Sequence, residues 1–205
     1  RLRQNPLEDI HSYSRVTYTP DGESDLDQLW QDLDAQVQAE VNTSLRSDFP
    51  DWVDISTTGM ETSPLQVYRA DEQISATRLR IAYYTEWTDG ISIVEGTLPQ
   101  EPSDTNIDVE VAIPFQMAIA LDVNVGDTLT LVEDARESSQ PIVAQITAIV
   151  IEDDFTDARW FEPSPLRVDQ GSPLEANLLT TRGSVLRITD EFIPETRSRL
   201  HWRVV

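Results

Sequence analysis

The amino-acid sequence predicts an α+β fold, in which one long amphipathic helix packs against a sheet. Three observations lead to this prediction: an apolar stripe at helical spacing near the start, alternating apolar segments through most of the remaining chain, and turn-forming residues between them. The 205 residues are enough to bury about 70% of the surface that the unfolded chain exposes. A packed core is therefore expected.

A strand followed by a helix opens the chain. Residues 14–19 alternate between apolar and polar side chains, which is typical of a half-buried strand. A turn at 20–22 follows, and Ser24 is a good N-cap for a helix. Apolar residues at steps of three and four then predict a helix over 24–47, with a stripe made of Leu26, Leu29, Trp30, Leu33, Val37, Val41 and Leu45.

The rest of the chain is mostly β. A short, largely buried helix is predicted over 114–121, with Pro114 at its first position. Residues 153–184 contain several prolines and show no clear period, so they are expected to be mainly loop. Alternation predicts strands at 65–69, 78–83, 107–113, 128–131, 145–151 and 200–205.

The charge of the chain excludes several kinds of partner. Fifteen arginines, no lysine and 37 acidic residues give a formal net charge of −22. Such a surface repels phosphate backbones, so nucleic-acid binding is not expected, and anionic lipid is disfavoured for the same reason. No apolar run reaches the roughly 18–20 residues that span a bilayer. Because a strand pattern runs to the last residue, we expect the chain to be part of a longer protein.

No catalytic, cofactor-binding or metal site is predicted. The chain has only His11 and His201, each near one end, and no G-x-S-x-G, so a Ser-His-Asp triad has little support. Scattered glycines and the lack of lysine exclude a Walker-type phosphate loop, and the lack of cysteine excludes thiolate chemistry. We therefore expect a protein that is not an enzyme and needs no cofactor.

The acidic cluster Glu152-Asp153-Asp154-Phe155-Thr156-Asp157 leaves one question open. Calcium prefers clustered oxygen ligands, but the spacing is not that of a calcium-binding loop and no glycine makes the sharp turn. A solvated acidic face is the preferred interpretation, and cation binding stays undecided. Trp87 and Trp160 fall in loop-like stretches where exposure is possible, whereas Trp30 and Trp202 are expected in the core.

Three stretches share their order and spacing with a known family. Residues 93–99, IVEGTLP, form a glycine-proline turn; residues 109–131 run as a strand, a short alanine-rich helix and a V-G-D turn; residues 146–151 form a returning strand before an acidic segment with a tryptophan. Together with the opening strand and helix, they resemble the periplasmic core domain of MacB/FtsX-type ABC-transporter permeases over roughly residues 14–160. Val150 stands where the family often has glycine.

The resemblance implies a location and an architecture. The domain would lie on the extracytoplasmic side of a bacterial cell membrane, between the first two transmembrane helices of a permease. A porter-like α+β subdomain with the long helix would be built from residues 1–90 and 146–205. A β-rich subdomain with the short helix would be inserted over residues 91–145.

The resemblance also implies a function without catalysis. The domain would transmit ATP-driven motion, with its own transmembrane helices and a cytoplasmic ATPase subunit as partners, and it would contact a second copy or an extracytoplasmic protein. The turn at Gly126-Asp127 and the helix residues Leu29, Leu33, Val37 and Val41 would have structural roles.

The alternative function is a stand-alone secreted carbohydrate-active or calcium-binding module, based on the acidic cluster and an exposed tryptophan. The flanking gene sequence separates the two. An apolar run of about 20 residues encoded just before Arg1 favours the permease, while a signal peptide or a hydrolase domain favours the alternative.

The net charge predicts a salt-dependent stability. The melting temperature should rise from low to molar sodium chloride at neutral pH, because screening relieves the repulsion within a chain of charge −22. Near the sequence pI of about 4.2, where the net charge vanishes, the same addition should have a much smaller effect. A melting temperature that stays constant or falls at neutral pH contradicts the prediction.

Overall fold

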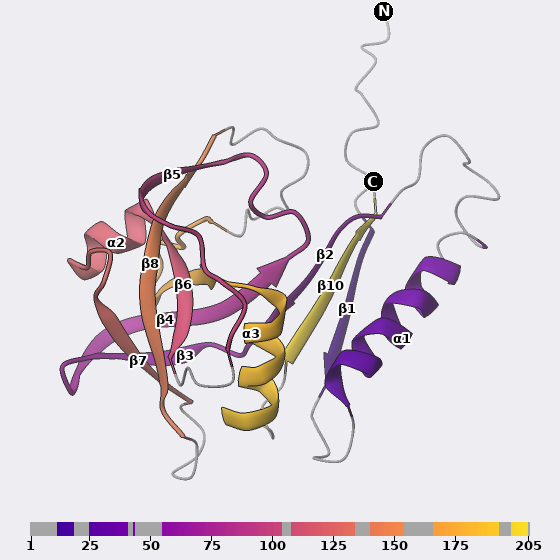
Figure 1. Cartoon of the computed structure of the whole chain (residues 1–205), viewed down its shortest axis with the longest axis horizontal. Coiled ribbons are helices and arrows are strands. Elements are labelled where there is room, and N and C mark those ends of the chain that lie inside the picture. The colour runs from indigo at the N-terminus through magenta and orange to yellow at the C-terminus, as the bar shows by residue number, and fades with distance from the viewer. Residues whose placement is uncertain are drawn as a thin grey trace, which may run out of the picture.

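The computed structural model describes residues 12–18, 25–40, 43, 55–103, 108–133, 140–153, 166–192 and 198–204. Within these ranges the chain forms both helices and strands, which confirms the α+β class (Figure 1). The helices are α1 (Leu26–Glu40), α2 (Phe115–Leu121) and α3 (Arg182–Arg187), and α3 continues as a π-helical turn, η2 (Ile188–Phe192). The strands are β1 (Ser12–Tyr18), β2 (Ile55–Glu61), β3 (Leu65–Arg69), β4 (Glu72–Tyr84), β5 (Ile91–Gly96), β6 (Val109–Pro114), β7 (Thr128–Glu133), β8 (Ile142–Glu152), β9 (Leu174–Leu179) and β10 (Ser198–Val204).

The described strands form one mixed sheet. Its order is β1-β10-β2-β4-β3-β7-β8-β6-β9, and β5 pairs with β8 beside this path. The pairs β4–β9 and β6–β8 are parallel and the others are antiparallel. The antiparallel pairing of β1 with β10 joins the first described strand to the last. Every strand predicted from the sequence lies within one of these strands or overlaps it.

The helix α1 is shorter in its described part than the predicted 24–47. It begins after Asp25, whose carboxylate oxygen Oδ1 accepts hydrogen bonds from the backbone N–H groups of Asp27 (3.0 Å) and Gln28 (3.2 Å). The N-cap is therefore Asp25, one residue after the predicted Ser24. On the apolar stripe, Trp30 is buried, and half-buried residues including Leu33 and Val37 pack against the core; Val41 and Leu45 lie outside the described residues.

The helix α2 differs from its prediction in two ways. Pro114 has an extended backbone (φ −58°, ψ 136°) and ends β6, so it precedes the helix instead of occupying its first turn. The helix is also not largely buried, because it lies on one side of the sheet and turns its other face to solvent. Met117, Ala118 and Leu121 are buried, whereas Phe115 and Ile119 are exposed.

The prediction that residues 153–184 are mainly loop is wrong for the second half of that range. Strand β9 pairs in parallel with β4, a strand about 100 residues earlier, and its burial does not alternate cleanly. Helix α3 follows, and the Thr181 side chain caps it by accepting a hydrogen bond from the Ser184 N–H at 3.3 Å. Strands β2 and β5 also lack an earlier prediction.

Buried side chains form two clusters on opposite faces of the sheet. The larger cluster includes Trp30 of α1, Met117 of α2 and Val185 of α3, so all three helices contribute to one face. The smaller cluster contains alternate residues of the same strands, such as Ala112 of β6 between two members of the larger cluster. Trp87 belongs to the smaller cluster and is 5% exposed, so the possible exposure considered for it is wrong.

The three stretches quoted from the sequence meet at one point of β8, which we call the β8 junction (Gly96-Thr97, Gly126-Asp127 and Ile146-Thr147). The Thr97 N–H donates to the Thr147 carbonyl at 2.8 Å. The Gly126 N–H donates to the Ile146 carbonyl at 2.8 Å, and the Ile146 N–H donates to the Asp127 carbonyl at 2.9 Å. A register shift in the β6–β8 pairing falls at the same place. The junction therefore fixes β5, β6 and β7 relative to β8.

The junction predicts that Gly96 is harder to replace than Gly126. Both residues have positive φ angles, +85° and +94°, but a Cβ atom at Gly96 would lie 2.0 Å from the Thr147 carbonyl oxygen, whereas a Cβ at Gly126 meets no atom within 4 Å. Gly126→Ala should cost about 1–2 kcal/mol of unfolding free energy, from backbone strain alone. Gly96→Ala should cost about 3 kcal/mol or more, because the β5–β8 backbone must also shift. Urea unfolding of the two variants measures the difference, and equal losses contradict it.

Candidate functional site

Arg182 connects α1 to the rest of the protein. Its guanidinium group forms an ion pair with the Asp27 carboxylate and lies 5.7 Å from the centre of the Trp30 ring, a distance typical of a cation–π contact. Arg182 is the first residue of α3, and Asp27 and Trp30 lie in the first turns of α1. The helix α1 is therefore held by one side chain of α3 as well as by its apolar stripe.

The turn at Gly126-Asp127 is held by Arg69, the last residue of β3. The Arg69 guanidinium donates to the carbonyl oxygens of Leu121 (3.3 Å) and Asp122 (2.7 Å), where α2 ends. The same group lies 3.6 Å from the Asp127 carboxylate, which in turn accepts a hydrogen bond from the Asn124 N–H. These contacts hold the Asp127 side chain beside the end of α2.

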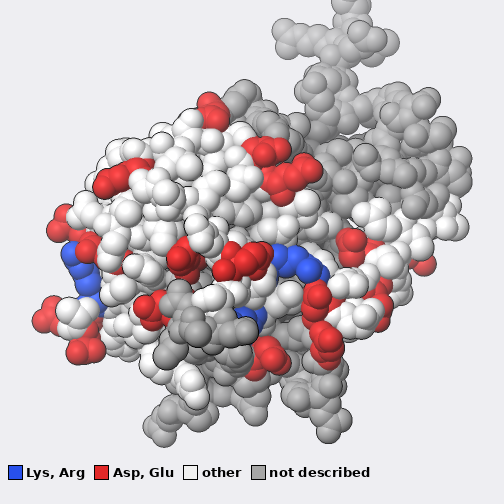
Figure 2. All heavy atoms as spheres, in the orientation of Figure 1, with Lys and Arg blue, Asp and Glu red and all other residues white. Residues whose placement is uncertain are grey.

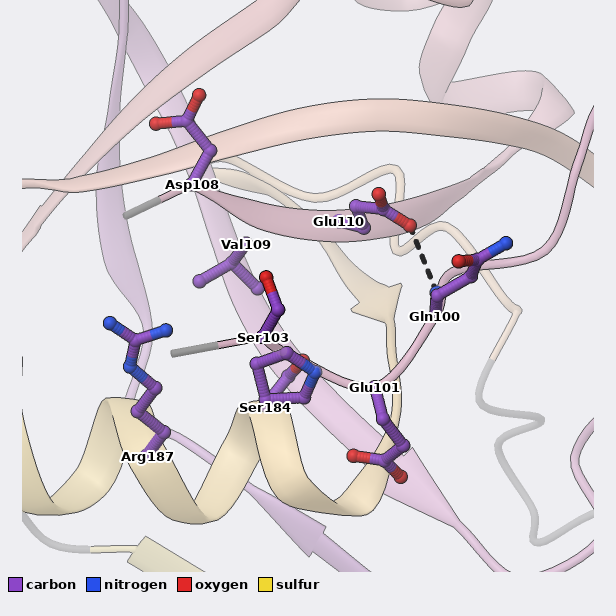
Figure 3. A pocket seen from close by; sticks show the side chains of 9 residues that line it. Gln100, Glu101, Ser103, Asp108, Val109, Glu110, Ser184 and Arg187 are labelled. Carbon is purple, nitrogen blue, oxygen red and sulfur yellow. Dashed lines mark hydrogen bonds between the residues drawn. The ribbon is translucent and has the colours of Figure 1, made fainter. Parts of the chain in front are cut away.

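A pocket of about 120 Å³ lies between α3, the start of β6 and the segment that follows β5 (Figure 3). Figure 3 shows Ser184 and Arg187 rising from α3, with Gln100 and Glu101 on the facing segment and Glu110 on β6. Pockets that bind metabolites usually have volumes of about 300–1,000 Å³, so this one is small. Its lining residues are Gln100, Glu101, Pro102, Ser103, Asp108, Val109, Glu110, Ser184 and Arg187.

The carboxylates of this pocket hold local structure together. Glu110 accepts a hydrogen bond from the Gln100 N–H at 2.9 Å, which fastens the segment after β5 to β6. Glu101 accepts one from the Thr181 hydroxyl at 3.1 Å, which fastens the same segment to the start of α3. The two lining serines, Ser103 and Ser184, have no histidine beside them in the lining.

The acidic cluster after β8 is only partly described. Glu152 is buried, at 6% exposure, and the Ser92 hydroxyl donates a hydrogen bond to the carboxylate of Asp153. Residues 154–157 and Trp160 lie outside the described residues, so cation binding by the whole cluster stays undecided. In the part of the chain that the structure describes, no three or more His, Cys, Asp or Glu side chains gather in a way that could hold a metal ion.

Of the two histidines, His201 lies in β10, in register with Arg15 of β1 and Gly59 of β2, and His11 lies outside the described residues. Among the described helices, none is both long enough and apolar enough to cross a bilayer.

The most distinctive surface of the described chain is apolar. Its large exposed hydrophobic side chains are all on three neighbouring elements, β5, α2 and the end of β8: Ile93, Val94, Phe115, Ile119 and Ile151. We call this set the apolar surface. Figure 2 shows the corresponding side of the molecule as a broad uncharged area with carboxylates around it. In a chain of net charge −22, neighbouring elements that expose five large hydrophobic side chains are the best candidate for an interface.

Comparison with known proteins finds similar solved structures, including the two that follow. No family model matches the sequence, and no curated protein matches it. The periplasmic region of MacB from Actinobacillus actinomycetemcomitans is similar with a TM-score of 0.40 and 13% identity, over 80% of this chain and 63% of that chain. A domain of a predicted permease protein from Porphyromonas gingivalis is similar with a TM-score of 0.36 and 12% identity, over 74% of this chain and 56% of that chain. The chain spans less than two thirds of the length of either structure.

Strand β5 and the contacts of Arg182 differ in how far the sequence predicts them. The run Ile91-Ser92-Ile93-Val94 is rich in β-branched residues, and that composition favours a strand at β5. Arg182 has no comparable signal, because its partners Asp27 and Trp30 are more than 150 residues away in the chain.

The contacts of Arg182 predict its contribution to α1. Arg182→Ala removes the ion pair with Asp27 and the contact with Trp30, so amide hydrogen exchange in α1 should accelerate by about tenfold. The ion pair itself contributes little of this effect, because both side chains are about a third exposed or more. The control is Arg167→Ala, which removes an exposed arginine. Equal exchange rates in the two variants would show that α1 is held by its apolar stripe alone.

Proposed function

We propose that this chain is a non-catalytic, extracytoplasmic domain of an ABC transporter permease. The observation that carries the proposal is the β8 junction, where the three stretches that resemble MacB/FtsX-type permeases contact one another through backbone hydrogen bonds. These contacts support the resemblance, because all three stretches contribute to the same backbone arrangement at β8.

The residues of the junction support a role in architecture. Gly96 is required by a close backbone approach, and Asp127 is placed by its neighbours Arg69 and Asn124. A polypeptide that transmits motion needs elements that move as one body, and strands tied to a common partner strand supply them. We infer that the domain follows the ATP-driven motion of its own transmembrane helices and of a cytoplasmic ATPase subunit.

The division into a porter-like subdomain (1–90 and 146–205) and an inserted subdomain (91–145) belongs to the same proposal. In this assignment α1, held by Arg182, is part of the porter-like subdomain, and α2 is part of the insert. Contact with a second copy or with an extracytoplasmic protein would use exposed surface, for which the apolar surface is the candidate.

The alternative of a secreted carbohydrate-active or calcium-binding module has lost part of its basis. A stacking site for sugars needs exposed aromatic rings, and Trp87 is buried. Of the acidic cluster, Glu152 is buried, and Asp153 accepts a hydrogen bond from Ser92. No described residue favours the carbohydrate-active or calcium-binding alternative over the permease domain.

The location is tested with reporter fusions in the full-length gene. An alkaline phosphatase that folds only outside the cytoplasm, joined after Val205, should be active, because the proposal places this residue on the extracytoplasmic side. A β-galactosidase joined at the same position is the matched control and should be inactive, since it loses activity when exported. The opposite pattern of the two activities contradicts the proposed location.

The lack of catalysis is tested on the chain itself. Calorimetry with ATP and magnesium should detect no binding, because the proposal assigns nucleotide binding to a separate subunit. Micromolar ATP binding would contradict the proposal whatever the reporter fusions show.

A further inference from the structure

Strand β5 is an exposed edge of the sheet. Its residues Ser92 to Gly96 are all exposed, with 45% exposure at Ile93 and 51% at Val94. Among the described strands, β5 pairs only with β8. In a paired strand, alternate N–H and C=O groups point away from the partner, so the outer edge of β5 offers backbone groups that another strand can bind.

The sequence of β5 has only part of the usual protection of such an edge, namely the bulge at Val94 and the charge of Glu95. Proteins commonly block an exposed edge with lysine, with proline or with an inward-pointing charge. The residues Ile91 to Val94 contain none of these. A register shift between Ile93 and Glu95 makes Val94 the extra residue of a bulge, and consecutive aliphatic side chains are exposed there. The bulge therefore presents apolar area beside the unpaired backbone.

The surroundings of β5 determine which partner fits. Asp89, Glu95 and Asp153 are exposed carboxylates before, within and across from the strand. Ser92 donates a hydrogen bond to Asp153 and holds this carboxylate beside β5. A second copy of the chain would bring the same carboxylates and a further charge of −22 to the contact, which is repulsive. A segment with basic side chains meets attraction at the same place.

We propose that β5 is a strand-addition site for an extended segment of another protein, in which aliphatic residues alternate with lysine or arginine. The segment extends the sheet beyond β5 by backbone hydrogen bonds. Its aliphatic side chains contact Ile93 and Val94, and its basic side chains face Asp89, Glu95 and Asp153. Ile151 of β8 pairs with Ser92, one residue from Ile93, and therefore lies on the other face of the sheet, together with Ser92. The site would exist whether or not the chain belongs to a permease.

The binding test uses two labelled peptides of equal charge, acetyl-KVKVKVK-amide and acetyl-KPKPKPK-amide, with the whole chain. Both peptides are attracted by the acidic surface, but only the first can pair as a strand, because proline has no N–H to donate. The valine peptide should bind more tightly by about tenfold or more at moderate salt, by fluorescence anisotropy. Equal affinities would mean unspecific electrostatic attraction and would overturn the proposal.

A matched pair of variants locates the site. Val94→Lys places a charge on the proposed contact and should weaken binding of the valine peptide by about tenfold. Ser75→Lys adds the same charge to an exposed residue of β4, outside the apolar surface, and should change the affinity by less than about twofold. Equal effects of the two variants overturn the proposal.

Hydrogen exchange on the unmodified chain keeps the test independent of how the variants fold. Addition of the valine peptide should slow amide exchange in β5, and protection confined to other elements overturns the proposal. Sedimentation measures the competing occupant: a dimer of the unmodified chain that Val94→Lys abolishes would assign the edge to a second copy and would also overturn it.

Discussion

The hydrogen bond between the Thr97 N–H and the Thr147 carbonyl is the contact on which the arrangement around β8 depends. It forms where the register of β6 against β8 shifts, so that Val111 pairs with Ile146 and Ala112 pairs with Ala148. The extra residue, Thr147, reverses which side chains of β8 face which cluster: Ile146 and Ile149 lie in the larger cluster, and Ala148 and Val150 in the smaller. Thr147 also sets the position of β5 and hence of the exposed edge.

Three arginines join separate elements in a chain that has no lysine. Arg69 joins the end of β3 to the end of α2, and Arg182 joins α3 to α1. Arg80 of β4 reaches Glu175 of β9 at 2.7 Å, across the parallel pair that sequence patterns did not reveal. A guanidinium group has five N–H donors, so one side chain can hold several acceptors, as Arg69 does with two carbonyl oxygens and a carboxylate. The arginines of this chain, 15 beside 37 acidic residues, thus contribute contacts between elements as well as positive charge.

The features that the sequence predicted correctly are those determined by local spacing. The stripe of α1 and the alternation of β3, β6, β7 and β8 follow from periods that a few neighbouring residues define. Strand β9 escaped prediction because its partner β4 is distant in the chain, and the cap at Asp25 because Ser24 is an equally good N-cap by type. Trp87 is buried although the sequence allowed its exposure, because a turn can fold against a core cluster without any periodic pattern. The contacts of the candidate site, such as Arg182 with Trp30, depend on the same distant pairings.

The negative charge of the protein accounts for how an exposed aliphatic edge at β5 avoids self-association. An aliphatic strand edge without lysine or proline is normally a risk of self-association, because two copies can pair edge to edge. Here the carboxylates Glu95 and Asp153 border the edge, and the net charge of −22 opposes the approach of any identical chain. The same charges do not oppose a basic partner. The repulsion that keeps identical chains apart therefore favours binding of a basic segment at the β5 edge. With this repulsion between copies, β5 has neither lysine nor proline at its edge and stays available for a different chain.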